Sequence, residues 1–158
     1  MTISEQINDD VIKFLKESST AVVATSFRND VRASTVYFTV DHEFNFYFVT
    51  KRKTSKYLNA EMNPQGAIVV GTGPEHITVQ AHGRIDLIVN EVEKQKIIDL
   101  LIGKQNLIGV KIWPIDEMKD MKYTQKVVFK ITPDELYYMN IDSTRHPDTI
   151  NDDYMKII

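Results

Sequence analysis

Hydrophobic residues recur at two different spacings along the chain, and the spacing changes where the type of secondary structure is expected to change. Residues 5–17 place apolar side chains three, four and seven positions apart, which predicts an amphipathic helix with Ser4 as its cap. The next apolar runs, 20–27 and 31–40, are rich in β-branched residues and are separated by the polar residues 28–30. They predict a β-hairpin.

The rest of the chain continues to alternate between strand-like and helix-like periods. In order, it predicts a strand at 45–50, a helix at 54–62, strands at 66–71 and 77–89, a helix at 91–104, and strands at 122–132 and 135–141. Asn63 and Pro64 are expected to end the second helix, because a residue before proline avoids the helical conformation. Gly103 is expected to close the third helix as a C-cap.

The number and length of these elements indicate the fold class. Many short antiparallel strands with few helices between them are typical of a small closed or half-closed β-barrel with helices at its ends. The 158 residues suit a single core, and neither a repeat nor a linker-like stretch divides them. We therefore expect one mainly β (α+β) domain over residues 1–158, with a polar C-terminal tail from about 141.

Composition narrows the classes of function. The absence of cysteine excludes a disulfide scaffold, thiolate catalysis and thiolate metal sites. A net charge of -3 provides no general positive field for nucleic acid or anionic lipid. The N-terminal segment is acidic and lacks the apolar run of a signal peptide, and no apolar stretch approaches the ~20 residues of a transmembrane helix. We expect a cytoplasmic protein with no membrane or nucleic-acid partner.

A basic loop lies between the strand predicted at 45–50 and the helix predicted at 54–62. The hydroxyls of Thr50, Thr54 and Ser55 flank it, and Lys56 follows in the first turn of the helix. Together with the free amides of a helix N-terminus, these groups are placed to converge on one phosphate dianion. The segment is therefore a candidate phosphate site.

Two alternatives remain open for the same loop. Charge runs are usually solvated, so Lys51, Arg52 and Lys53 can equally form a plain surface turn in which Thr54 only caps a helix. Nucleic-acid binding through this loop is a weaker alternative, because such binding normally uses an extended basic patch.

The histidines do not predict a metal site. They are His42, His76, His82 and His146. Neither the HExxH motif nor an i, i+4 pair occurs among them, so we expect no metal. His82 shares one face of the strand 77–89 with Gln80 and Arg84, where it either lines a pocket or faces solvent. No GxSxG elbow is present, and the residues alone assign no catalytic group.

Four stretches of the chain follow one another in an order that has a known counterpart. They are RASTVYF at 32–38, FVT at 48–50, TSK at 54–56 opening a helix that closes with NP at 63–64, and VQAHGRI at 79–85. In this order they resemble the pyridoxamine 5'-phosphate oxidase-like family, the FMN-binding split barrels. The resemblance covers about 19–88 and, more loosely, 127–140. Its most specific part is the Thr-x-x-x-Thr-Ser-Lys spacing that begins at Thr50.

The resemblance implies a fold, a cofactor and an assembly. The fold is a split β-barrel of about six or seven antiparallel strands with flanking short helices, and the assembly is a homodimer with FMN sites at the subunit interface. The implied cofactor-binding residues are Arg32, Ser34, Val49, Thr50, Thr54, Ser55, Lys56, Gln80 and Trp113. Of these, Arg32, Thr54, Ser55 and Lys56 would contact the phosphate, and the backbone around Val49 and Thr50 would run beside the flavin ring. Trp113 is either a ring neighbour or a hydrophobic anchor of its own loop.

The resemblance also implies a function. Hydride transfer to a flavin would make the protein an FMN-dependent oxidoreductase that acts on an unidentified small molecule. Tyr37 stands where the vitamin-forming enzymes have a lysine, which implies a substrate other than pyridoxamine phosphate. A non-catalytic redox or stress sensor, or an FMN carrier, is the alternative function. Deazaflavin or haem is an alternative cofactor, because related groups place other planar cofactors on this fold.

Overall fold

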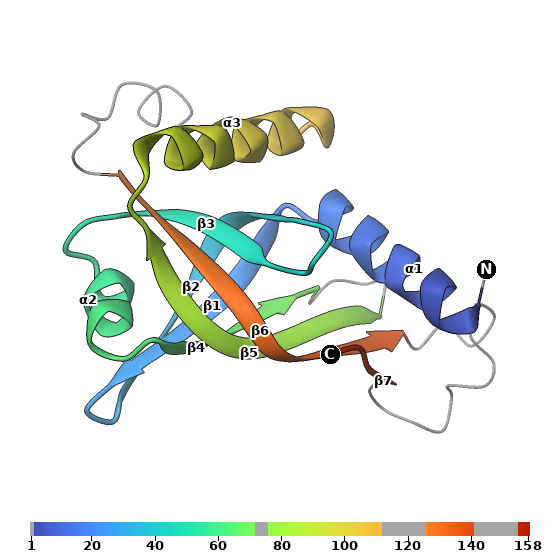
Figure 1. Ribbon diagram of the computed structural model, residues 1–158, viewed down its shortest axis with the longest axis horizontal. Coiled ribbons are helices and arrows are strands. Elements are labelled where there is room, and N and C mark those ends of the chain that lie inside the picture. Colours follow the sequence, from blue (N-terminus) through green and yellow to red (C-terminus); the bar gives the residue numbers. More distant parts are fainter. Residues whose placement is uncertain (1, 72–75, 112–125, 141–154) are drawn as a thin grey trace.

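The computed structural model describes residues 2–71, 76–111, 126–140 and 155–158. Within these residues the chain forms a β-barrel with helices around it (Figure 1). In chain order the elements are α1 (Ile3–Glu17), β1 (Thr20–Phe27), β2 (Asp30–Val40), β3 (Phe46–Lys51), α2 (Ser55–Met62), β4 (Gln65–Val70), β5 (Ile77–Ile88), α3 (Glu91–Leu107), β6 (Lys126–Asn140) and β7 (Met155–Lys156).

All the described strands belong to one antiparallel sheet. Its order is β3-β2-β1-β4-β5-β6-β7, and a further pairing between β3 and β6 closes the first six strands into a barrel. The short β7 pairs with Tyr137 and Tyr138 near the end of β6, beyond the part of β6 that pairs with β3. The expected mainly β barrel of six or seven antiparallel strands is confirmed, whereas β7 lies in the segment expected to be a polar tail.

The barrel interior is filled by alternate residues of each strand. Phe38, Phe46, Phe48 and Phe129 are among the largest fully buried side chains, and the rings of Phe48 and Phe129 stack with their centroids 5.5 Å apart. Such offset aromatic pairs stabilise a core beyond the area that they bury. β3 and β6 are thereby joined by side chains as well as by their hydrogen-bond ladder.

The helices cover different parts of the barrel (Figure 1). α1 and α2 lie at opposite ends, and α3 runs along the outside over β3 and β6. Ile97 and Ile98 of α3 are buried against Val128 of β6. Val128 points outward from the barrel and is buried because α3 covers it.

Two helix ends differ from the predictions. α1 begins at Ile3 and is capped by Thr2, whose side chain accepts from the Glu5 amide while the Glu5 carboxylate accepts from the Thr2 amide. This reciprocal capping box satisfies two free amides, so the prediction of Ser4 as the cap was wrong. α3 continues through Gly103 to Leu107, and Gly109, with a φ of 72°, follows the C-cap instead.

The two strands predicted at 122–132 and 135–141 are one strand. β6 runs through Pro133, because the register against β5 shifts by one residue between His82 and Gly83 and leaves Asp134 as the extra residue of a β-bulge. Before the bulge the odd-numbered residues face the barrel interior, and after it the even-numbered ones do. The bulge therefore absorbs the proline that had suggested the end of a strand.

Gly83 makes the bulge possible. A Cβ atom at this position would lie 2.1 Å from the carbonyl oxygen of Thr132 and 2.7 Å from the amide nitrogen of Asp134. Both neighbours are backbone atoms and cannot move aside like a flexible side chain. Only glycine allows β5 and β6 to approach this closely.

We predict that Gly83→Ala lowers the free energy of unfolding by about 1–3 kcal/mol, because the added methyl group must push two backbones apart. Urea denaturation followed by circular dichroism measures the effect. Gly103→Ala is the matched control: it lies inside α3, a Cβ there meets nothing within 4 Å, and alanine should raise stability by about 0.5–1 kcal/mol. Equal stability of the wild type and Gly83→Ala would contradict the close approach.

Candidate functional site

The loop after β3 leads directly into the N-terminus of α2. Thr54 caps this helix: its hydroxyl oxygen accepts from the Tyr57 amide at 3.3 Å, and the same hydroxyl donates to the Lys51 carbonyl at 3.1 Å. The cap fixes the turn between the strand and the helix. It also holds the Thr54 hydroxyl beside the end of β3.

Thr50, Thr54 and Lys56 meet at this point. The Thr50 hydroxyl lies 3.3 Å from that of Thr54 and accepts a hydrogen bond from the Lys56 ammonium at 3.3 Å. Thr50 is buried, and burial of the Lys56 amine lowers its pKa. Among the described residues, the Lys56 ammonium bonds to no carboxylate, so a bound anion would offset the cost of burying its charge.

The other groups of the basic loop do not join this cluster. Ser55 is the exposed first residue of α2. The Arg52 guanidinium lies 6.0 Å from the ring centroid of Tyr57 and donates to its hydroxyl at 3.5 Å. Lys51 and Lys53 are exposed. Solvated cations and a convergent cluster are therefore both present, and Lys56 is the cation that contacts the cluster.

Arg32 lies on the same side of the sheet as α2 but bonds elsewhere. On β1 it pairs with Thr25, whose hydroxyl accepts a hydrogen bond at 3.5 Å from Asn59 of α2. The exposed Arg32 guanidinium, however, donates to the Asp30 carboxylate at 3.0 and 3.1 Å. Ser34 lies two positions further on the same face of β2 and is half-buried.

The remaining predicted residues lie apart from the cluster. The side chain of Val49 points away from the barrel interior and packs with the Ile97 cluster beneath α3, which leaves only its backbone to follow a ligand. Gln80 lies on the outer face of β5, between Val69 of β4 and Tyr137 of β6. Trp113 lies outside the described residues.

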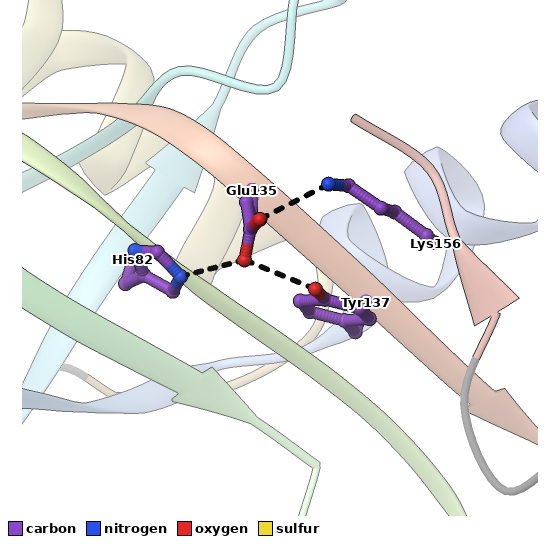
Figure 2. A network of polar contacts seen from close by, with 4 residues as sticks. All are labelled: His82, Glu135, Tyr137 and Lys156. Atoms are coloured by element: carbon purple, nitrogen blue, oxygen red, sulfur yellow. Dashed lines mark hydrogen bonds and ion pairs between the residues drawn. The ribbon is translucent and has the colours of Figure 1, made fainter.

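A second polar cluster lies on the outer face of the barrel (Figure 2). One carboxylate oxygen of Glu135 is 2.9 Å from His82 Nε2 and accepts from the Tyr137 hydroxyl at 3.0 Å. The other accepts from the Lys156 ammonium at 3.0 Å. These bonds, led by the one from Lys156, lower the pKa of Glu135 to about 2, so the carboxylate is charged throughout the neutral range. We call His82, Glu135, Tyr137 and Lys156 the Glu135 cluster.

The sequence contained only part of the signal for this cluster. The outward alternation of Gln80 and His82 was visible along the predicted strand. Their cross-strand neighbours, Tyr137 and Glu135, depend on the one-residue shift at Gly83, which no local pattern reveals. Lys156 belongs to a segment of two paired residues that is too short for a periodicity.

A groove of about 1110 Å³ lies between α3, the end of α1 and the end of β2, and Lys104 forms part of its wall. The Lys104 ammonium donates to the carbonyls of Leu15 and Phe38 at 2.9 and 3.0 Å and lies 3.6 Å from the ring centroid of Phe38. Burial lowers the pKa of Lys104 to about 7. These contacts join α3 to α1 and β2, so Lys104 has a structural role at the end of the barrel opposite α2.

A family model described as pyridoxamine 5'-phosphate oxidase matches residues 7–140. The chain belongs to the pyridoxamine 5'-phosphate oxidase family. The match covers the barrel, the basic loop and the outer face of β5 and β6, so both polar clusters except Lys156 lie within it. No curated protein sequence matches the chain.

Several solved structures share the fold of this chain. General stress protein 26 from Bacillus anthracis is 18% identical with a TM-score of 0.64, over 84% of this chain and 93% of that chain. A conserved hypothetical protein from Mycobacterium tuberculosis is 14% identical with a TM-score of 0.70, over 93% and 89%. A Clostridium acetobutylicum protein related to general stress protein 26 is 11% identical with a TM-score of 0.68, over 96% and 94%. At these identities the likeness shows the fold alone.

Two further findings, on membrane spans and on metal ligands, concern the described part of the chain. None of its helices is long and apolar enough to cross a membrane. Nor do three histidine, aspartate or glutamate side chains gather there in a way that could hold a metal ion. The Glu135 cluster, with one carboxylate and one imidazole, is a hydrogen-bond network.

We predict that the wild type becomes more stable relative to Lys104→Met as the pH rises from 7.5 to 9.5. The pKa of Lys104 is about 7 in the folded chain and near its usual 10.5 when unfolded, so unfolding takes up a proton in this range and is disfavoured as pH rises. The difference in unfolding free energy should change by about 2–3 kcal/mol, measured by urea denaturation at both pH values. Parallel pH dependences would show that the lysine keeps its usual pKa.

Proposed function

We propose that the protein binds FMN and acts as an FMN-dependent oxidoreductase on a small molecule. The observation that carries the proposal is the meeting of Thr50, Thr54 and Lys56 at the N-terminus of α2, in a chain of the pyridoxamine 5'-phosphate oxidase family. A phosphate ester carries the negative charge that this cluster lacks. FMN, rather than riboflavin, is therefore the form of flavin that the cluster suits.

The residues present fit a phosphate in three respects. Lys56 supplies a cation whose burial is not offset by a carboxylate in the described residues. Thr50 and Thr54 supply hydroxyls within 3.3 Å of one another. The N-terminus of α2 supplies backbone amides with a favourable dipole. Arg32 would join if its guanidinium left Asp30, to which it is bound in an exposed ion pair of low expected energy.

The position of Gln80 supports a site shared between two chains. On β6, Thr50 lies opposite Val127 and Gln80 lies opposite Tyr137, ten positions further along the strand. At about 3.3 Å per residue this separation is roughly 30 Å, and the two side chains also face opposite sides of the sheet. One FMN can therefore contact both only if they come from different subunits. A homodimer with two sites at its interface meets this condition, whereas a sedimentation mass of one chain, 18.2 kDa, would contradict it.

In this assignment the flavin supplies the redox chemistry, since its ring accepts a hydride. The chain would bind it at one end: Lys56 and the two threonines would hold the phosphate beside the N-terminus of α2. The substrate is a small molecule that reaches the ring. Reduction of bound FMN by NADH or NADPH, followed by reoxidation with an added acceptor, would distinguish an enzyme from a flavin-binding module.

We predict that the purified protein, incubated with FMN and desalted, retains the two visible absorption bands of a flavin. Lys56→Met should weaken FMN binding by about 10- to 100-fold, because one charge-assisted contact to the phosphate is lost. Riboflavin binding should change by less than about twofold, because riboflavin lacks the phosphate. Fluorescence titration of the two flavins against both proteins measures these ratios.

Lys53→Met is the matched control for this experiment. It removes the same charge from the same loop, but Lys53 is exposed and belongs to no contact of the cluster. FMN affinity should stay within about threefold of wild type. Equal weakening of FMN and riboflavin by Lys56→Met would contradict the phosphate assignment, and no visible bands after incubation would overturn FMN as the cofactor.

A further inference from the structure

α3 carries a second apolar row besides the one that packs on the barrel. Ile97 and Ile98 are buried against β6. On another side of the helix, Val92, Leu100 and Leu107 leave 80%, 55% and 90% of their surface exposed. These three residues are eight and seven positions apart, close to two helical turns in each case, so they lie in one row. Within the described residues, this apolar row is left uncovered.

The row forms one wall of the groove between α3, the end of α1 and the end of β2. From Val92 to Leu107 the wall is roughly 22 Å long at ~1.5 Å per residue. The groove has a volume of about 1110 Å³ and a mostly apolar wall, as is typical of small-molecule sites. Gly103 leaves the wall open beyond Leu100, because a Cβ there would meet nothing within 4 Å. The groove therefore suits an elongated apolar chain.

The same groove contains cations that lack a counter-charge. The Lys104 ammonium contacts only neutral groups in the described residues, namely the Leu15 and Phe38 carbonyls and the Phe38 ring, and burial lowers its pKa to about 7. Lys16 follows Leu15 directly, so it lies at the Lys104 end of the groove. Neither Lys16 nor Lys96 has a hydrogen bond or ion pair with a described residue. An anion in the groove would offset these charges.

The carboxylates that line the groove do not provide this anion. Each of the three already has a partner close to it in the sequence. The partners are Asn45 and Tyr47 for Asp41, Lys94 for Glu91, and Gln95 for Asp99. None of the three carboxylates bonds to Lys16, Lys96 or Lys104 in the described part of the chain. The cations are therefore the charged groups that a ligand can pair.

We propose that this groove binds a dissolved long-chain carboxylate. The carboxylate group lies at the Lys16 and Lys104 end, and the chain extends over Leu100 toward Val92, roughly 18 Å away along α3. A short anion would leave the apolar row exposed, and an uncharged apolar molecule would leave the lysines uncompensated. The inference goes beyond the proposed function and does not depend on it, since the groove and α2 lie at opposite ends of the barrel (Figure 1).

We predict that dodecanoate, kept below its micelle-forming concentration, binds with one molecule per chain and a Kd at or below about 1 mM. Decanoate, which is two methylene groups shorter, should bind roughly tenfold more weakly. Dodecyltrimethylammonium has the same chain with a cationic head, and it should bind at least about tenfold more weakly. Isothermal titration calorimetry of the full chain gives these ratios. Equal binding of the cationic compound would overturn the assignment of an anionic ligand.

Matched variants test where the dodecanoate binds. Leu100→Gln should weaken its binding about fivefold to tenfold, whereas Leu58→Gln, at a leucine that is 50% exposed on α2, should stay within about twofold of wild type. Lys16→Met should weaken it about threefold to fivefold. Lys13→Met removes the same charge from an exposed position of α1 outside the groove and should stay within about twofold. Equal effects of the two leucine variants would contradict the location.

Two other results would also overturn the inference. Loss of dodecanoate binding in Lys56→Met would place the ligand at the cluster of Thr50, Thr54 and Lys56. Binding to vesicles of anionic phospholipid without binding of dissolved dodecanoate would make the groove a membrane contact. FMN binding is measured separately by its visible bands, so failure of the proposed function and failure of this inference can be told apart.

Discussion

The close approach of β5 and β6 at Gly83 is the constraint on which the barrel and its outer face both depend. The one-residue shift in register occurs at Gly83, where the two backbones meet at distances that no Cβ permits. Because of the shift, the fifteen-residue β6 buries side chains on both sides of the bulge. Its odd-numbered residues face the interior beside β3, and its even-numbered residues face the interior beside the start of β5. A regular β6 would expose Leu136 and bury the charge of Glu135, at a large cost.

Closure of the barrel in turn determines where Thr50, Thr54 and Lys56 meet. Pairing with β6 runs to the end of β3, whereas the ladder between β2 and β3 stops at Phe38 and Phe48. Thr50 thus lies in the last part of β3, which is paired with β6 but not with β2. The cap at Thr54 then turns the chain within four residues, so that the first turn of α2 begins beside Thr50. Local helix chemistry and global topology therefore specify the same site.

Features governed by local chemistry could be predicted from the sequence, and features governed by long-range pairing could not. The spacing of Thr50, Thr54 and Lys56 needs only one strand end and one helix start, and the structure brings these three side chains together. Arg32 was placed in the same group by its strand, but the nearby Asp30 holds its guanidinium. Pro133 suggested a strand break because the bulge that accommodates it depends on a glycine fifty residues earlier in the chain. Cross-strand partners of this kind leave no periodic signal.

The two polar clusters differ in how their charges are balanced. At α2 a partly buried cation bonds only to a neutral hydroxyl among the described residues, which favours a permanent anion such as a phosphate. On the outer face, Lys156 already provides a cation beside Glu135, and the bond between Glu135 and His82 orients the imidazole ring. Along β6, Glu135 lies eight positions from Val127, the residue that pairs with Thr50. This spacing is roughly 25 Å at about 3.3 Å per residue, well beyond the ~10 Å over which exposed charges interact in dilute salt, so the two clusters are electrostatically independent within one chain.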